Sequence, residues 1–420
     1  MGKKRIGYIA LLRQNKPFRR LFGAIEISYI GDWFTIIALF LLSAERSDNS
    51  PLAIAGVLAT RSFSMAFLEP FTGMLADRYS RKKLMVISCV LPFMILSTVI
   101  VSGLMTSLLS IYVVTVALTA SRALFDPAEY AYIPNICNEE ELLTANAITS
   151  GGWSVALGIG ASLGGYTIAT YGTDIALIID AMTYIVAIAL LVSLPEGGPS
   201  HDERRPLTAK SGFSDIVQGW SYVRKTPEIN RVIRLKAAWA IGGGAQVFLL
   251  VLIGDYVQFG QVATGIGLLY MMRGLGSGFG PVAFRGLMDQ PERSAQIIRV
   301  ALVFSGGFYL IVSGIEWTWV ILLLVFCSHA ASGINWVLST TMLQRRSEDE
   351  WRGRVAGTDF FLITLMMGCS AILAGSILEF TSLSLRSVLA GTAMLQIGAG
   401  VVWYLVYASA ERAYHESATA

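Results

Sequence analysis

Long apolar runs, separated by short charged or turn-rich stretches, recur along the whole chain. A helix needs roughly 20 consecutive apolar residues to cross a lipid bilayer. The pattern therefore predicts an all-α polytopic membrane protein with twelve transmembrane helices. The predicted spans are residues 20–44, 51–76, 84–104, 107–131, 145–170, 174–194, 231–254, 260–284, 295–314, 317–341, 355–379 and 386–408.

The longest polar stretch, residues 195–229, separates the first six spans from the last six. We therefore predict an N-terminal six-helix bundle at 1–194 and a C-terminal six-helix bundle at 230–420, joined by a cytoplasmic connector. Apolar residues recur at helical spacing within the connector, which predicts an amphipathic helix lying along the membrane surface or packed on the protein's own loops. These residues are Phe213, Ile216, Val217, Trp220 and Val223.

One faint internal repeat links the two halves. Residues 134–147 and 344–356 are both acidic links that enter a span rich in Gly and Ala. Two pseudo-symmetric bundles of this kind predict a substrate site between them, near the middle of the membrane.

The composition supports a membrane location. Hydrophobic residues make up 54% of the chain and charged residues 15%, whereas a soluble domain carries about 25% charged residues. The four cysteines form no CxxC pair and the three histidines are dispersed, so neither a metal site nor a disulfide framework is expected. No phosphate-binding P-loop is present, which leaves a proton or other ion gradient as the energy source and no bound cofactor.

The 32 Lys and Arg residues are unevenly distributed over the predicted loops. Most fall on the side that holds both termini, including Lys236 at the exit of the connector, whereas Arg46 and Arg386 lie in loops on the other side. Cytoplasmic loops are enriched in basic residues. We therefore expect a multi-pass protein of the plasma (cytoplasmic) membrane with both termini in the cytoplasm.

A charged motif connects the second and third spans and runs from Gly73 to Leu84. It resembles the loop signature of the major facilitator superfamily, G-x-L-a-D-R-x-G-R-K-x-x-L, with Ser80 in place of the second Gly. The resemblance implies a loop that latches the two bundles on the cytoplasmic side, opposite the segment from Arg354 to Asp359. Taken alone, the cluster also suits a solvated loop that anchors two helices. The gate residues are Gly73, Asp77, Arg78, Arg81 and Lys82.

Further stretches resemble the macrolide-efflux and enterobactin-exporter-like branch of that superfamily. They are Phe18–Phe22, Gly31–Trp33, Phe125–Ala128, Glu140–Ala147 and Arg352–Val355. The branch implies proton-coupled export of an amphipathic small molecule, such as a drug, macrolide or siderophore, by alternating access. The antiporter signature of span five departs from its pattern, because Ala161 replaces its proline and Ala156 its first glycine. The small-residue face for close helix contact is retained, and the proline kink is lost.

Ionisable residues at bilayer depth cost at least about 2.5–3.5 kcal/mol each, so they usually face a cavity or a partner. Counted along their helices, Asp32 and Arg61 reach similar depths and are expected to meet at mid-membrane. They form either a pair that exchanges partners when a proton or substrate arrives, or a static ion pair. Glu26 has no cation near it in the sequence, which suits a carboxyl that binds a proton. These three residues are proton-coupling candidates.

Span four presents Arg122, Asp126 and Glu129 on one helix face, at spacings i, i+4 and i+7. Arg122 stands where many members of the resembled family carry an arginine implicated in proton coupling, which makes it the fourth candidate. Asp126 and Glu129 approach the cytoplasmic edge and are expected to contact a gate or lipid headgroups. Glu69 is expected to belong to the cytoplasmic latch.

The expected partners are a small-molecule substrate and the lipid bilayer, with no nucleic acid, and the protein is expected to be a monomer. Alternative functions within the same fold are import of a small metabolite and movement of a lysophospholipid between leaflets. A membrane-embedded protein that transports nothing is the alternative from another class. An enzyme is not expected, since the chain has neither a GxSxG nor an HExxH motif.

Overall fold

The computed structural model is helical throughout the part of the chain that it describes, with fifteen α-helices and no β-strand there. The described residues are 6–76, 78–196, 209–257, 260–288, 290, 293–348 and 350–419. The helices are α1 (Tyr8–Gln14), α2 (Lys16–Glu45), α3 (Pro51–Ala76), α4 (Arg81–Ser102), α5 (Leu108–Ile136), α6 (Glu139–Tyr171), α7 (Thr173–Val192), α8 (Ala209–Lys225), α9 (Pro227–Tyr256), α10 (Val262–Ala283), α11 (Arg285–Met288), α12 (Ser294–Gly314), α13 (Val320–Arg346), α14 (Arg352–Phe380) and α15 (Leu385–Thr419).

Twelve of these helices are at least 20 residues long, and each corresponds to one predicted span. The predicted twelve-helix class is therefore confirmed. Helix ends follow local sequence signals. Asn138 caps α6 in a reciprocal arrangement with Glu141, which explains why α6 begins six residues before its predicted apolar run. Gly103 ends α4 in the left-handed conformation, with φ of 62°.

Ten of the twelve helices are apolar enough to be recognised as spans by hydropathy alone. The other two, α6 and α10, pack against one another through small residues. A methyl group added to Gly267 of α10 would lie 2.6 Å from the carbonyl oxygen of Ala161 in α6. Such close backbone approach requires small residues. The contact therefore explains the lower hydropathy of these two helices.

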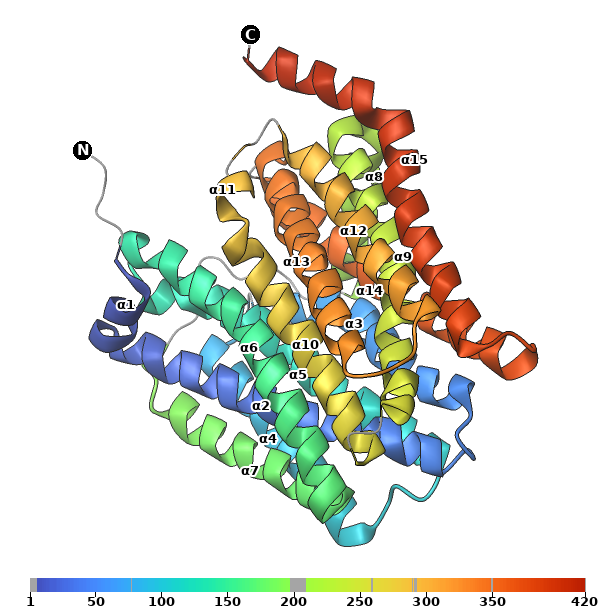
Figure 1. The fold of residues 1–420 in the computed structure, drawn as a ribbon. Coiled ribbons are helices and arrows are strands. Elements are labelled where there is room, and N and C mark those ends of the chain that lie inside the picture. The colour runs from blue at the N-terminus through green and yellow to red at the C-terminus, as the bar shows by residue number, and fades with distance from the viewer. Residues whose placement is uncertain are drawn as a thin grey trace.

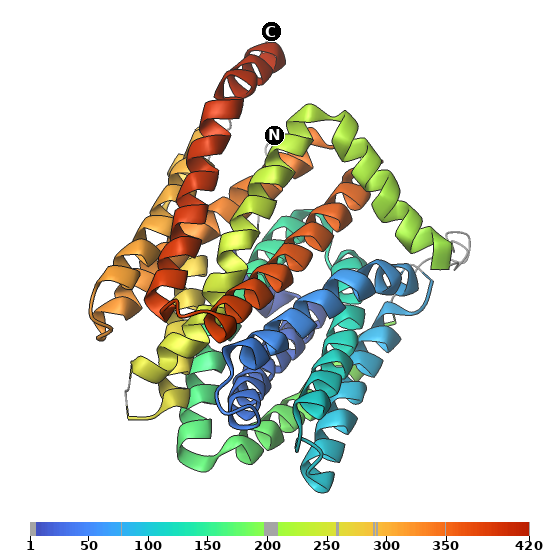
Figure 2. The ribbon, with the colours of Figure 1, turned by 90° about the vertical axis from the view of Figure 1, so that its right-hand side faces the viewer.

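The helices form two groups, α2 to α7 and α9 to α15 (Figures 1 and 2). We call the end that carries segments 193–196 and 347–348 the basic end, and the end that carries 46–50 and 381–384 the opposite end. In Figure 1, α2 runs across the view and α15 from top to bottom, so the two groups diverge toward the basic end.

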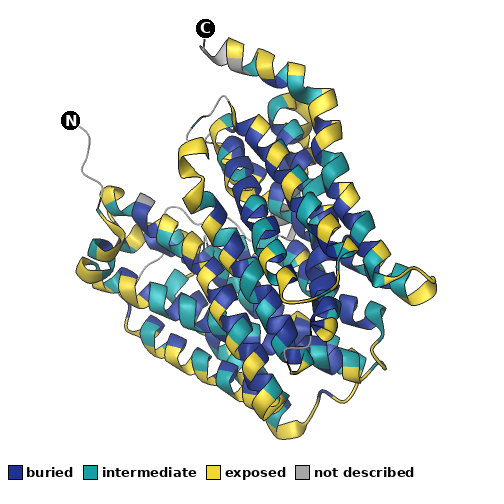
Figure 3. Cartoon of the chain, in the orientation of Figure 1, coloured by how far each residue is buried: buried dark blue, intermediate teal, exposed yellow. Residues whose placement is uncertain are grey.

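The two groups meet at the opposite end, where α3 packs on α14. The Ser50 hydroxyl donates a hydrogen bond of 2.7 Å to Glu379, and a methyl group added to Gly375 would lie 2.7 Å from Cβ of Ala55. Buried residues run through the centre of the molecule, and exposed residues lie mostly on its outer faces (Figure 3). The seam between the groups is thus tightly packed at this end.

The connector contains the predicted helix, α8, and the part described packs on the protein. A methyl group added to Gly219 would lie 2.6 Å from the Arg354 carbonyl oxygen of α14. Tyr222 stacks on Trp351, with ring centres 4.7 Å apart. Trp220 nevertheless stays 39% exposed. The described part of α8 therefore packs on the start of α14, and its predicted position along the membrane surface stays a prediction (Figure 2).

Candidate functional site

Arg122 is the centre of a charged cluster that joins α2 and α5. Its Nε atom lies 2.9 Å from Oδ1 of Asp126, one turn along the same helix. Its Nη1 atom lies 3.8 Å from Oδ2 of Asp32 in α2. The guanidinium also stacks on two aromatic rings, 3.5 Å from the centre of Tyr29 and 4.7 Å from that of Phe125. Arg122 thus contacts α2 through both charge and an aromatic face.

Asp32 is held by a second partner, because the Tyr184 hydroxyl of α7 donates a hydrogen bond to its Oδ1 atom. The expected ion pair between Asp32 and Arg61 is corrected by the structure: among the described residues, the cation bound to Asp32 is Arg122. Arg61 acts on Asp32 only at longer electrostatic range. Counting residues along a helix gives depth, whereas rotation about the helix axis decides which side chains meet.

Glu26 lies within electrostatic range of the same arginine, Arg122. Its side chain packs on α6 where Gly152 leaves room, since a methyl group there would lie 2.8 Å from the Glu26 carboxyl carbon. Its Oε1 atom is buried and has no hydrogen-bond partner among the described residues. An unpaired buried carboxylate is costly, so Glu26 is suited to carry a proton.

Two further acidic residues lie closer to this cluster than expected. Glu129 is only 6% exposed and lies within electrostatic range of Arg122 and Glu26. Asp126 binds Arg122 and accepts a hydrogen bond of 3.3 Å from the Tyr29 hydroxyl. Both were predicted to face a gate or lipid headgroups. The structure instead places them with Arg122, because α5 continues as a helix well beyond them to Ile136.

Glu69 and Asp180 surround the cluster on other helices. Glu69 of α3, predicted to belong to the latch, lies within electrostatic range of Asp126. Asp180 of α7 is 1% exposed and accepts hydrogen bonds from the Thr35 and Thr183 hydroxyls. The N-terminal group of helices therefore gathers more carboxyl groups than cations around one arginine.

The gate motif between α3 and α4 contacts its own helix group. Arg81 donates hydrogen bonds to the carbonyl oxygen of Ala131, at 2.9 Å, and to Asn135, at 3.0 Å. Lys82 forms an ion pair of 3.4 Å with Glu196.

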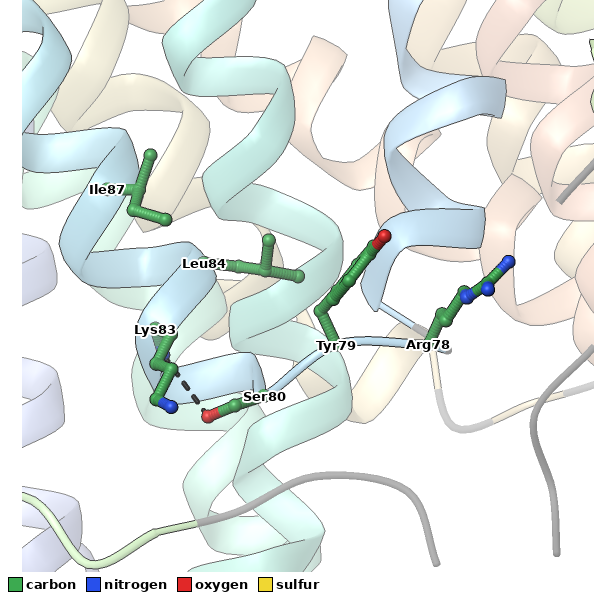
Figure 4. Close-up of a pocket in the computed structure, with 6 residues that line it drawn as sticks. All are labelled: Arg78, Tyr79, Ser80, Lys83, Leu84 and Ile87. Carbon is green, nitrogen blue, oxygen red and sulfur yellow. Dashed lines mark hydrogen bonds between the residues drawn. The ribbon is translucent and has the colours of Figure 1, made fainter. Parts of the chain in front are cut away.

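The side chain of Arg78 extends from the segment that joins α3 and α4 (Figure 4). A methyl group added to Gly73 would have no neighbouring atom within 4 Å among the described residues. Ser80, which replaces the motif's glycine, caps α4 by accepting a hydrogen bond of 3.4 Å from the Lys83 amide. Asp77 lies outside the described residues, so its expected contact with residues 354–359 stays a prediction.

The start of α14 holds a second buried charge pair. Asp359 binds Lys236 of α9, and the two residues are 7% and 1% exposed. The Lys236 ammonium also donates a hydrogen bond of 3.2 Å to Thr340 and lies 4.7 Å from the Trp336 ring centre. Arg354 stacks on Trp351, with its guanidinium carbon 4.8 Å from the ring centre. Asp359, predicted as a gate residue, is thus engaged within its own helix group.

Sequence reasoning placed Lys236 in the basic exit of the connector, which the structure shows to be wrong. Lys236 lies about 14 Å along α9 from its first residue, deep inside the helix. Its position within a predicted apolar run was the available signal. Within the described residues, no group of three or more His, Cys, Asp or Glu side chains is placed to hold a metal ion.

Comparison with known proteins identifies the family and the fold of this chain. Residues 21–367 match the family model described as Major Facilitator Superfamily. An uncharacterised MFS-type transporter, YfiS of Bacillus subtilis, is 24% identical over 92% of this chain and 93% of its own. The enterobactin exporter EntS of Citrobacter koseri is 27% identical over 83% of this chain and 82% of its own.

Solved structures of transporters share the fold. A point mutant of the peptide transporter POT superposes with a TM-score of 0.77 and 11% identity, covering 97% of this chain and 96% of its own. A bacterial homologue of the human lysosomal transporter Spinster, solved in an inward-facing and unoccupied conformation, gives a TM-score of 0.65 at 13% identity, covering 94% and 95%. With most of its length matched by the family model, the chain belongs to the Major Facilitator Superfamily of membrane transporters.

Proposed function

We propose that this transporter is a proton-coupled exporter of an amphipathic small molecule, such as a drug, macrolide or siderophore, and that it works by alternating access. Support for export comes from relatives named as exporters. These include the enterobactin exporter of Citrobacter koseri and a putative bacilysin exporter of Bacillus subtilis, which is 28% identical over 42% of this chain and 44% of its own.

The observation that carries the proposal is the shared use of Arg122 by two carboxylates on different helices. Asp32 and Asp126 both bind this guanidinium, and Glu129 and Glu26 lie nearby. One cation does not neutralise four carboxylates at bilayer depth, so protons are the natural counter-charge. When a proton binds Asp32, its ion pair with Arg122 is lost and Arg122 is left to Asp126. Proton binding thereby loosens the contact between α2 and α5.

The arrangement of the two helix groups supports alternating access. Their opposite ends are in contact through Ser50 and Glu379, and their basic ends diverge (Figure 1). We assign the basic end to the cytoplasm because cytoplasmic loops are rich in Lys and Arg. On this assignment the protein lies in the cytoplasmic membrane with both termini inside, and the structure represents an inward-open state that is ready to load cargo.

The units that move are proposed to be residues 1–194 and 230–420, with 195–229 as the cytoplasmic connector. A single chain suffices for this mechanism, since both groups belong to it. The energy source is the proton gradient, and no bound cofactor takes part.

Transport in membrane vesicles tests the proposal. Inside-out vesicles are energised to an acidic lumen and screened with siderophores, macrolides and hydrophobic dyes. A transported compound should accumulate in the lumen, and collapsing the pH gradient should abolish its accumulation. Arg122→Gln and Asp32→Asn should each lower proton-driven accumulation at least tenfold. Arg46→Gln, in a loop at the opposite end, is the matched control and should transport normally.

Other outcomes would replace the proposal. Accumulation only in right-side-out vesicles would indicate import. Movement of a lysophospholipid between leaflets, with no transport of the soluble compounds, would indicate a flippase. Normal proton-driven transport by both cluster variants would remove Arg122 and Asp32 from the coupling site.

A further inference from the structure

Two arginines lie at matching depth in different helix groups. Arg61 is ten residues from the start of α3, and Arg273 is eleven residues from the start of α10. At 1.5 Å per residue, each lies roughly 15 Å from the opposite end of the protein. They are close enough to repel one another electrostatically. Both guanidinium groups are therefore near the middle of the membrane. Arg273 also lies beside Tyr270, whose ring contacts Trp33 of α2 in the other helix group.

Neither arginine has an acidic partner in the described part of the chain. Arg273 is surrounded by aromatic rings, 5.6 Å from the ring centre of Tyr270 and 5.8 Å from that of Trp153. Arg61 makes neither an ion pair nor a hydrogen bond there, and it acts on Asp32 only at long range. Cations at bilayer depth are costly unless they are paired. Two guanidinium groups that repel one another and form no ion pair with the described residues therefore favour the binding of an anion.

The other cations deep within helices differ in this respect. Arg122 binds Asp32 and Asp126, and Lys236 binds Asp359. Asp32, the carboxylate on which Arg61 acts electrostatically, is already bound to Arg122. Among the described residues, no carboxylate forms an ion pair with Arg61 or Arg273, so an anion from outside the protein can bind both guanidinium groups.

We propose that Arg61 and Arg273 together bind an anionic group of the cargo, and that the cargo is an organic anion with an aromatic or flat apolar body. The inference rests on the proposed transport function and specifies its substrate class. Arginine binds carboxylate, sulfonate and similar groups through charge-assisted hydrogen bonds. Trp153, which is 40% exposed and has its ring centre 5.8 Å from the guanidinium carbon of Arg273, offers an aromatic surface beside this charge.

One arginine comes from each helix group, which gives the site a role in the transport cycle. Arg61 belongs to α3 and Arg273 to α10. A bound anion cancels their repulsion and bridges the two groups. Loading of the cargo therefore favours the approach of the two groups, whereas the empty site resists it.

Equilibrium binding tests the inference without requiring transport. The full-length protein in lipid nanodiscs is dialysed against 1-naphthoate, its neutral analogue 1-naphthamide, or inorganic phosphate. We expect the wild type to bind 1-naphthoate at least tenfold more tightly than 1-naphthamide and more tightly than phosphate. Arg61→Gln and Arg273→Gln should each remove this preference for the anion. Arg61→Lys should keep most of it, and Arg299→Gln, a cation beside Tyr404 in another part of the protein, should keep all of it.

The outcomes separate this inference from the proposed function. Equal binding of 1-naphthoate and 1-naphthamide, or a preference unchanged in both Gln variants, would overturn the anion site. Phosphate binding as tight as that of 1-naphthoate would overturn the aromatic anion as ligand. If vesicles export only neutral or cationic compounds in a proton-dependent manner, the anion site fails while the exporter stands. Anion-selective binding without proton-driven transport would leave the site and remove the exporter.

Discussion

The guanidinium carbon of Arg122 lies 3.5 Å from the centre of the Tyr29 ring, and the Tyr29 hydroxyl donates to Asp126, which Arg122 also binds. Tyr29 therefore positions both members of the ion pair from the neighbouring helix. A planar cation fits between this ring and the carboxylates, whereas the compact ammonium of lysine lacks the planar face for stacking and the fork of donors.

We expect Arg122→Gln to destabilise the protein strongly in neutral solution and less in acid. Removing one partner of a buried ion pair costs about 3–5 kcal/mol, and here two carboxylates lose their cation. At pH 5 these carboxylates take up protons more readily, so the lost cation matters less. Thermal unfolding in nanodiscs at pH 5 and pH 8 measures the difference. Arg122→Lys should lie between Gln and wild type, and an equal loss at both pH values would contradict this account.

The sequence was sufficient for the number of helices and for their assignment to spans, because long runs bounded by charged or turn residues mark every span, including α6 and α10, which hydropathy alone does not identify. It was also sufficient to place Arg122, Asp126 and Glu129 on one face of one helix. It did not give the partner of Asp32. Depth follows from counting residues, but the rotation of α2 against α5 and α7 depends on packing, and this rotation brings Arg122 and Tyr184 to Asp32.

Partners far apart in the chain were also missed. Lys236 and Asp359 are 123 residues apart, and each occurs near the end of a predicted apolar run, where a loop or gate residue is the ordinary interpretation. Nothing in the sequence indicated that Tyr29 and Tyr184 bond to carboxylates, because aromatic residues in spans usually serve packing. Their roles depend on hydroxyl positions that only the folded chain defines.

Lys236 and Asp359 are expected to be coupled, so that the losses of unfolding free energy caused by the two single substitutions do not add in the double variant. Lys236→Met leaves a buried carboxylate, and Asp359→Leu leaves a buried ammonium, so each should lower unfolding free energy by about 3–5 kcal/mol. The double variant removes both charges and should recover most of this loss. Unfolding in SDS measures all three variants in one double-mutant cycle, and additive losses would show that the two residues are not coupled.

Close packing of α6 on α10 makes Gly267 a position where larger side chains are excluded. Gly267→Val should force α10 away from the Ala161 carbonyl oxygen, which lies 2.6 Å from where even a methyl group would stand. The opposite ends of the two helix groups should then separate. Spin labels at Leu104 and Leu383, both exposed at that end, should report a longer and broader distance distribution.

A matched variant distinguishes packing from general damage. Gly307→Val lies on α12, where nothing stands within 4 Å of an added methyl group, and it should leave the distance distribution unchanged. The four native cysteines are replaced by Ser in all these proteins so that labels attach only at the chosen positions. A wild-type distribution in Gly267→Val would show that the α6–α10 contact does not hold the opposite end closed.

The end of α15 gives a last prediction, because the apolar pattern ends at residue 408 while the helix continues to Thr419. Glu411 lies in this extension, is 4% exposed, and binds Arg231 of α9 and Arg346 of α13, each at 2.6 Å. Truncation after Ala408 should therefore destabilise the C-terminal helices by about 3–5 kcal/mol, since two largely buried arginines lose their carboxylate. Glu411→Gln in the full-length chain should reproduce most of that loss. Truncation after Glu416 keeps Glu411 and should unfold like the wild type. If the chain that ends at Ala408 were as stable as the wild type, the ion pairs of Glu411 would contribute nothing to holding α15 against α9 and α13.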